Sequence, residues 1–242
     1  MSEFDLLQFP TTFAADRRGL LSELRTAAPH RAVADAAATA RGLPVCVLAG
    51  IASRESAWGL MLRPPGPGGT GDFTPRKGRV PPDGGGFGRG IMQIDYDAHS
   101  FARGAAWPNP AANIAYGALV LAQNVAYLRK ALGLVGHELL HAALAGYNCG
   151  AENVVRALRK GLDADYYTSG RDYGRDVLDR AGWFLAAGWG AAAVAVPVDP
   201  ADLDERERDA LLAQVAVVAR GEIDELEAGA PGGPTGEPPD AA

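Results

Sequence analysis

The residues best suited to chemistry in this chain are acids that flank a long stretch rich in glycine and proline. The first is Glu55, which follows an apolar run that starts at Pro44. We expect its carboxyl at the end of a buried helix, near Trp58, where poor solvation raises the pKa and makes a proton donor near neutral pH. The alternative is a structural Glu55 paired with its neighbour Arg54, because perturbed groups also occur outside active sites.

Further acids, Asp72, Asp83, Asp95 and Asp97, lie in this stretch or directly after it. Cleavage of a glycosidic bond uses two carboxyls in unlike environments, a neutral one that protonates the leaving oxygen and an ionised one. Glu55 would supply the neutral carboxyl, and Asp83, among prolines and glycines, the solvated one. Aspartates in loops also simply form turns, so both interpretations stay open.

A second pattern with chemical meaning is His-Glu-Leu-Leu-His at residues 137–141, on a predicted helix. Two histidines at this spacing share a helix face and can bind zinc, with the Glu as a base. A third ligand is also needed, yet Leu144 and Tyr147 stand where the extended motif has Gly and His. We therefore predict no metal and no other cofactor. His137 then belongs to a polar helix start and His141 is partly exposed, and a zinc protease is the alternative.

A third group consists of aromatic and polar side chains: Trp107, Tyr147, Asn148, Gln93 and His99. Aromatic faces and amide groups suit sugar rings and N-acetyl groups, because such side chains combine an apolar body with a polar end. They equally suit core packing and helix capping. On its own, this group identifies no ligand.

The bulk composition describes a globular chain. Its 242 residues, 48% of them hydrophobic, suffice for one large domain or a domain with appendages. Cys46 and Cys149 lie in apolar helical surroundings and are predicted to be buried free thiols, with a disulfide as the alternative. No run of about 18 apolar residues lacks charge, so we expect no membrane span. Acids replace the Lys or Arg of a secretory signal at residues 1–10, which predicts a chain made in the cytoplasm without one.

Charge is unevenly distributed along the chain. Residues 31–190 carry 17 basic and 13 acidic side chains, whereas residues 191–242 carry 3 and 12. A mildly basic middle suits a polyanionic partner such as a cell-wall polymer, and nothing in it suggests nucleic acid. The acidic end predicts an amphipathic helix over residues 199–227 and a disordered tail.

Periodicity and capping residues predict a mainly helical domain. Helices are expected over residues 13–27, 31–41, 44–55, 110–132, 137–147, 152–161 and 173–187. Glycines and prolines exclude a helix from residues 60–90, where a long functional loop is expected. It leads into a small, irregular β region in which Ile91, Met92 and Ile94 form a short strand.

Five ordered segments resemble the goose-type lysozymes and the related lytic transglycosylase domains. They are AGIASRES (49–56), GFGRGIMQID (86–95), ANIAYGALVL (112–121), AGYNCGAENV (145–154) and DYGRDVLDRAGWF (172–184). The resemblance implies a mainly α (α+β), lysozyme-like fold with a small β hairpin lobe and a cleft between the lobes. It divides the chain into an N-terminal helical extension (1–30), a catalytic domain (31–190) and an acidic C-terminal helix with its tail (191–242), which has no counterpart in the family.

The resemblance also implies a muramidase that cleaves the β-1,4 bond between N-acetylmuramic acid and N-acetylglucosamine by inverting hydrolysis. Glu55 matches the general acid, and Asp95 matches the acid that holds the attacking water. Asp83 is the counterpart of a second water-positioning acid, with Asp72 in reserve, although the insertion between Trp58 and Asp83 is longer than in compact members. The substrate-cleft positions of the motifs are Gln93, His99, Ile114, Tyr147 and Asn148.

Two alternatives keep the same fold. A lytic transglycosylase would use Glu55 alone and form 1,6-anhydromuramyl products, whereas a wall-binding component of a phage tail or secretion apparatus would have no turnover. The predicted partners are the glycan strands of peptidoglycan. Without a signal peptide, we expect action on the cell wall after release by lysis, injection or a non-classical route. Residues 191–242 would then contact a phage tail, a contractile particle or a secretion system.

Overall fold

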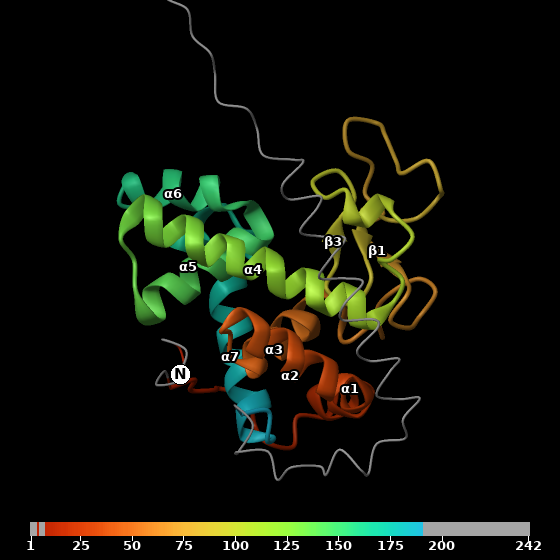
Figure 1. The fold of residues 1–242 in the computed structure, drawn as a ribbon, viewed down its shortest axis with the longest axis horizontal. Helices are drawn as coiled ribbons and strands as arrows, with labels where there is room; N and C mark the ends of the chain where they lie inside the picture. The colour runs from red at the N-terminus through yellow and green to blue at the C-terminus, as the bar shows by residue number, and fades with distance from the viewer. Residues whose placement is uncertain (1–3, 5–7, 191–242) are drawn as a thin grey trace, which may run out of the picture. The chain divides into compact units, whose positions relative to one another are not determined.

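The computed structural model describes residue 4 and residues 8–190, which form a helical body with a small β lobe at one side (Figure 1). The mainly α (α+β) fold class predicted from the sequence is confirmed. The predicted acidic helix over 199–227, and the partner contact expected there, lie outside the described residues. The helices are α1 (Arg18–Ala27), α2 (Arg31–Arg41), α3 (Val45–Ser56), α4 (Pro110–Leu132), α5 (Gly136–Cys149), α6 (Ala151–Arg159) and α7 (Tyr173–Ala186), with short 3-10 turns between them.

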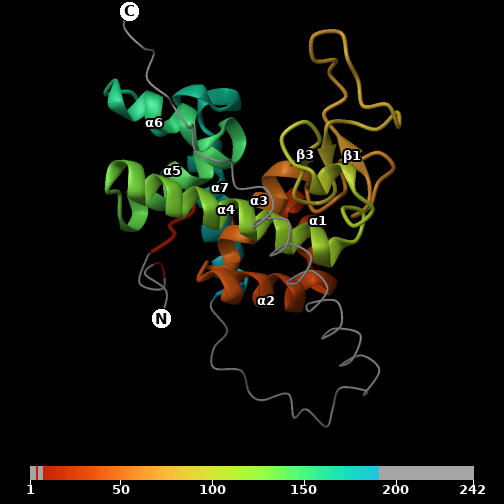
Figure 2. The ribbon, with the colours of Figure 1, turned by 45° about the horizontal axis from the view of Figure 1, so that its top comes forward.

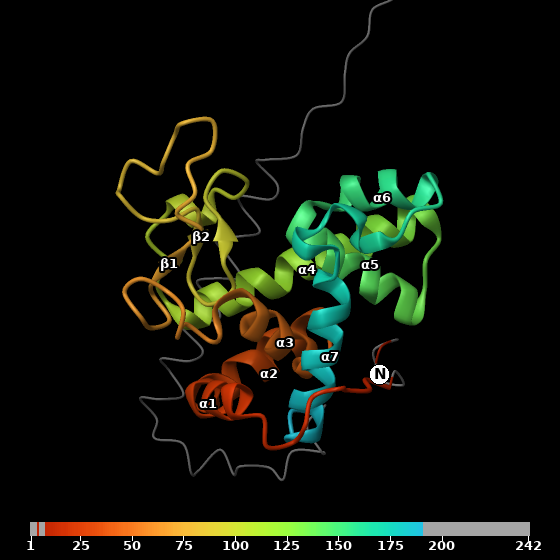
Figure 3. The same cartoon turned by 180° about the vertical axis from the view of Figure 1, so that it is seen from behind.

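Helix α3 runs through the middle of this body. Ten of its twelve residues are buried, and the other two are Arg54 and Glu55 near its C-terminal end. A helix that is apolar on all sides must be enclosed by other elements. Helix α7 covers it most closely, and the two lie side by side when the protein is viewed from behind (Figure 3). Glu55 is thus carried to the edge of the core by a rigidly packed helix.

The closest approach of α3 to α7 depends on Gly50. A Cβ atom at this position would lie 2.6 Å from the carbonyl oxygen of Val177 and 3.1 Å from the amide nitrogen of Ala181. Both are backbone atoms of α7, so they cannot rotate away as a side chain can. Any larger residue at Gly50 must push the helices apart.

Helix α4 links the two lobes. Asn109 caps it by accepting hydrogen bonds from the amides of Ala111 (2.8 Å) and Ala112 (3.1 Å), with Pro110 in the first turn, as predicted. Further along the helix, the buried Asn113 accepts a hydrogen bond from the Met92 amide (2.8 Å) and donates one to the Arg89 carbonyl (3.0 Å). The Asn113 side chain therefore attaches the β lobe to α4 through both its oxygen and its nitrogen.

The apolar character of α4 bears on the predicted absence of a membrane span. Among the described residues, α4 is the one single helix long and apolar enough to cross a membrane, and 56% of its apolar window is buried inside the protein. Residues 18–41 pass the same test only together with α3, across a bend of 120°. A helix that passes through a folded core has this composition too.

The β lobe is an antiparallel sheet in the order β1 (Thr70–Gly71), β2 (Gly88–Arg89), β3 (Ile94–Asp95). The prediction of a strand through Ile91, Met92 and Ile94 is wrong for Ile91 and Met92, and only Ile94 lies in a strand, β3. Positive φ angles at Gly90 (67°) and Gln93 (49°) turn the chain there, and Ile91 and Met92 become buried side chains of the turn. A long loop between β1 and β2 projects from the sheet (Figure 2).

Both cysteines are free thiols, as predicted, and Cys46 is buried; Cys149, which was also predicted to be buried, is half-buried. Burial raises the pKa of Cys46 to about 12 and that of Cys149 to about 11. Because the thiolate is the reactive form, neither side chain is suited to be a nucleophile at neutral pH.

The α3–α7 contact predicts the effect of adding one methyl group. Gly50→Ala should lower the free energy of unfolding by about 1–3 kcal/mol, because the helices must separate. The matched control is Gly19→Ala in α1, where a Cβ atom meets nothing within 4 Å and a better helix former should be neutral or stabilising. Urea unfolding of both variants measures the difference. Equal stability of the Gly50 variant and the wild type would contradict the close-packing argument.

Candidate active site

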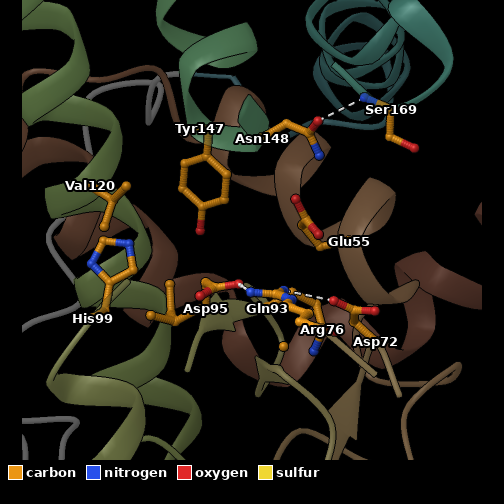
Figure 4. Close-up of a pocket in the computed structure, with 12 residues that line it drawn as sticks. Glu55, Asp72, Arg76, Gln93, Asp95, His99, Val120, Tyr147, Asn148 and Ser169 are labelled. Carbon is orange, nitrogen blue, oxygen red and sulfur yellow. Dashed lines mark hydrogen bonds and ion pairs between the residues drawn. The ribbon is translucent and has the colours of Figure 1, made fainter. Parts of the chain in front are cut away.

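A cavity of about 390 Å³ opens between the helical body and the β lobe (Figure 4). A volume of this size is typical of a small-ligand site. Most of the groups that line it are polar, and they come from both lobes. The lining residues are Glu55, Asp72, Arg76, Gly88, Gln93, Ile94, Asp95, His99, Val120, Tyr147, Asn148 and Ser169.

Glu55 is the acid on the helical wall. Its Oε1 atom accepts a hydrogen bond of 2.5 Å from the Tyr173 hydroxyl at the start of α7. Burial raises the pKa of Glu55 to about 7, and the Tyr173 hydrogen bond and the charge of Arg54 only partly offset it. Arg54 is engaged elsewhere, with Asp172 (3.3 Å) and Asp176 (3.2 Å). Glu55 is therefore a desolvated acid and not one half of a surface ion pair.

Two tyrosines flank Glu55 and stay protonated. Burial, together with the charge of Glu55, raises the pKa of both Tyr147 and Tyr173 well above the usual value. The Tyr147 hydroxyl donates to the Met92 carbonyl in the β lobe at 2.9 Å. Trp58 is absent from the described cleft lining; it is buried and packs against Trp189 instead. The dry environment around Glu55 thus includes buried tyrosines that the sequence analysis did not single out for this role.

The opposite wall holds a pair of acids, Asp72 and Asp95, that are joined by Arg76. Arg76 contacts Asp72 Oδ2 at 2.7 Å and Asp95 Oδ2 at 2.6 Å, as Figure 4 shows. The Oδ1 atom of Asp95 accepts from the amides of Asp97 and Ala98, both at 2.9 Å. The Oδ1 atom of Asp72 has no hydrogen-bond partner within the described part of the chain. Asp72 therefore presents the less engaged oxygen of the two acids.

Asp83 lies outside the described cleft lining. Its Oδ1 atom accepts from Arg89 Nη2 at 2.9 Å, and this hydrogen bond holds the pKa of Asp83 below its usual range. Arg89 is 1% exposed and lies over the rings of Tyr96 (4.7 Å) and Trp107 (5.1 Å). Asp83 thus neutralises a buried cation, and the reserve acid Asp72 is the one that reaches the cleft.

The other predicted cleft residues divide in the same way. Gln93, His99, Tyr147 and Asn148 line the cavity, but Ile114 is 1% exposed and belongs to the core. Five residues of the described lining were not predicted as site residues: Arg76, Gly88, Ile94, Val120 and Ser169. The sequence reasoning also missed Tyr173, which contacts Glu55. Tyr173 could have been found from the segment 172–184. Nothing in a loop of prolines and glycines singles out Arg76.

His99 is a neutral member of the cleft at pH 7. Burial lowers its pKa, and the nearby charge of Asp95 only partly offsets this, while Arg103 adds to the lowering. Its Nδ1 atom lies 3.2 Å from the Tyr116 hydroxyl, which fixes the ring at the end of the cleft. A neutral imidazole can donate or accept one hydrogen bond but adds no charge to the acid pair.

The His-Glu-Leu-Leu-His segment takes a structural role. His141 Nε2 bonds to the buried Asp165 Oδ2 at 2.8 Å, in a group with Asp163 whose spacing could hold a metal ion. Arg175 already supplies the cation there, at 2.8 Å from Asp163 and 3.8 Å from Asp165. His137 is not a member of this group, so the described residues provide no support for the zinc site of the sequence alternative.

A comparison with protein families agrees with this geometry. The family model described as "LysG: Lysozyme g" matches residues 21–188, from within α1 to just beyond α7. No match was found among curated proteins. The family supports a peptidoglycan-cleaving lysozyme activity, that of a glycoside hydrolase. Because the match covers well over half of the sequence and includes both walls of the cleft, the chain belongs to the goose-type lysozyme family.

Proposed function

We propose that this protein is a muramidase that hydrolyses the β-1,4 bond between N-acetylmuramic acid and N-acetylglucosamine with inversion. The observation that carries the proposal is the contrast between the two walls of the cleft. Glu55 has a pKa of about 7 on the helical wall, and the ion-paired Asp72 and Asp95 lie on the β wall. Inverting glycosidases need one protonated and one ionised carboxyl on opposite sides of the bond.

Glu55 is the general acid. In the protonated form it donates its proton to the glycosidic oxygen, so that the bond to the anomeric carbon can break. The carboxylate that remains keeps the hydrogen bond from Tyr173 at 2.5 Å. A hydrogen bond to an ionised acceptor is stronger than one to a neutral acceptor, so Tyr173 stabilises the product of proton transfer more than its reactant.

Asp72 is the acid that accepts a proton from the attacking water. Its Oδ2 is held by Arg76, and Oδ1 has no hydrogen-bond partner among the described residues, which leaves an oxygen for water. Both carboxylate oxygens of Asp95 are engaged, Oδ2 with Arg76 and Oδ1 with two backbone amides. Asp95 is therefore fixed in position, and through Arg76 it orients Asp72. This assignment replaces the predicted Asp83 with Asp72 and keeps Asp95 beside it.

The remaining lining residues suit a chain of N-acetylated sugars. Gln93 and Asn148 offer amide groups, and Tyr147 offers an aromatic face beside Glu55. Asn148 is held in place because its Oδ1 accepts a hydrogen bond from the Ser169 amide at 2.9 Å. Amides that are held in a fixed orientation can discriminate between substrates by the hydrogen-bonding groups that the substrates carry.

Replacement of Glu55 tests the proposal directly. Glu55→Gln should clear purified peptidoglycan about 10²–10⁴-fold more slowly than the wild type, because an amide cannot donate the required proton. The control is Glu152→Gln, which removes an exposed acid of α6 and should leave the rate unchanged. Clearing by the Glu55 variant at the wild-type rate would remove the general acid from the mechanism.

The pKa of Glu55 predicts the alkaline limb of the pH–rate profile. Activity should fall as the pH rises through about 7, because the acid form of Glu55 is lost there. Tyr173→Phe removes a hydrogen bond that favours the ionised form, so its alkaline limb should move to higher pH. Profiles of kcat/KM on soluble glycan fragments measure both effects. A wild-type rate that still rises above pH 8 would contradict the assignment.

A matched pair of variants tests the choice between Asp72 and Asp83. Asp72→Asn should lower the rate about 10²–10⁴-fold, because the water loses its base. Asp83→Asn should keep the rate but lower the free energy of unfolding by about 1–3 kcal/mol, because buried Arg89 loses its partner.

Mass spectrometry of the digest completes this experiment. Hydrolysis gives reducing muramyl ends, whereas a lytic transglycosylase gives 1,6-anhydromuramyl ends. Anhydromuramyl products, combined with an unaffected Asp72 variant, would mean that Glu55 acts alone. Clearing rates, product masses and urea unfolding together assign each aspartate either to the chemistry or to the fold.

A further inference from the structure

A short hairpin in the loop between β1 and β2 presents two arginines to the β wall. Arg76 and Arg79 exchange both backbone hydrogen bonds, each 3.0 Å long. Lys77 and Gly78 between them have φ angles of 51° and 75°, the left-handed values of a tight two-residue hairpin turn. The hairpin therefore fixes the backbone positions from which both arginine side chains extend.

The two arginines differ in what they reach. The Arg76 side chain is 37% exposed; it contacts Asp72 and Asp95, and its guanidinium lies 4.1 Å from the centre of the Phe87 ring. The Arg79 side chain is 68% exposed, and its ion pair is with Asp97 at 3.4 Å. One guanidinium is packed between acids that line the cleft, and the other stays at the rim.

We infer that Arg76 is a positioning residue for the hydrolysis: its guanidinium holds Asp72 and Asp95 as one charged pair that faces the water. This inference depends on the proposed function, and it adds a residue from the insertion to the machinery. A planar guanidinium can bond two carboxylates at fixed directions through separate nitrogens, as Nη2 and Nη1 do here. Lysine carries the same charge without that geometry.

Without Arg76, the negative charges of the acids on this wall would outnumber the positive charges beside them. Asp97 lies 3.7 Å from Arg76 and adds a third negative charge, with Arg79 as its remaining cation. Like charges that share a site cannot all stay ionised, so one proton would be retained to higher pH or the carboxylates would move apart. From the other elements, the titratable groups that line the described cleft with the pair are His99, Glu55 and Tyr147. His99 is neutral at pH 7, Glu55 is protonated below its pKa of about 7, and Tyr147 stays protonated throughout.

The consequence is a specific change in the pH–rate profile. Asp72 must be ionised to take a proton from water. If a proton is retained on this wall, the enzyme therefore becomes active only at a higher pH. Removal of Arg76 should therefore move the acidic limb to higher pH. The alkaline limb should stay near pH 7, because it belongs to Glu55 on the opposite wall.

The experiment compares Arg76→Gln, Arg76→Lys and Arg79→Gln in the full chain, with kcat and KM measured on soluble glycan fragments from pH 4 to 9. Arg76→Gln should lower kcat about 10–100-fold with little change in KM, and move the acidic limb up by about one pH unit. Arg76→Lys should restore the position of the limb and part of kcat, since it keeps the charge alone. Arg79→Gln, the matched control, should keep kcat within about twofold and leave the limb in place.

The outcomes separate this inference from the function on which it depends. An acidic limb unmoved in Arg76→Gln, or moved equally in Arg79→Gln, overturns the role of Arg76 even when Glu55→Gln and Asp72→Asn are inactive. Unaffected Asp72→Asn activity overturns the proposed hydrolysis instead. Thermal melting checks that each variant is folded. If Arg76→Gln does not fold, Arg76→Lys decides the question. The inference is supported if this variant has the acidic limb of the wild type but a reduced kcat, and it is overturned if its kcat equals that of the wild type.

Discussion

Glu55 meets Tyr173 across the interface between α3 and α7, and this contact depends on how closely the two helices pack. Gly50 allows the backbones to approach, which places the start of α7 beside the end of α3. The same interface excludes water from the carboxyl, and that exclusion is the main cause of its raised pKa. Arg54, the nearest cation in sequence, is held away by two aspartates of the α7 region. Helix packing, more than any neighbour in sequence, determines the protonation of Glu55.

The β lobe is held to the helical body by hydrogen bonds that leave the cleft open. Asn113 on α4 bonds to Met92 and Arg89, and Tyr147 on α5 bonds to Met92 from the other side. Because both attachments reach Met92 in the turn between β2 and β3, they fix the orientation of β3, the strand that contains Asp95. The acids of the two lobes can then face each other although the sheet itself has only two-residue strands.

Local signals in the sequence predicted much of this arrangement, and long-range contacts account for the differences. The Asn109 cap and the starts of α2 to α7 depend on neighbours along the chain, so pattern reasoning reached them, whereas the helix predicted from residue 13 begins only at Arg18. The apolar run of α3 predicted a buried helix end, but Tyr173, which contacts Glu55 there, comes from α7. Asp83 was predicted from its position among prolines and glycines and from the family resemblance, and neither reports which acid a long loop brings to the cleft. Arg89 draws Asp83 away from the cleft, and no periodicity could reveal that a buried arginine follows the glycines.

The long loop between β1 and β2 is the feature that most favours the proposed hydrolysis over transglycosylation. Ordering a loop costs conformational entropy for every residue that becomes fixed, and this loop carries Arg76, whose guanidinium lies between two carboxylates. A transglycosylase that worked through Glu55 alone would gain nothing from a charged pair on the opposite wall. A hydrolase needs an ionised base on that wall, opposite a Glu55 that still carries its proton. Both walls are ready only when these two conditions hold together, and the Arg76 guanidinium between Asp72 and Asp95 is the group expected to maintain the first of them.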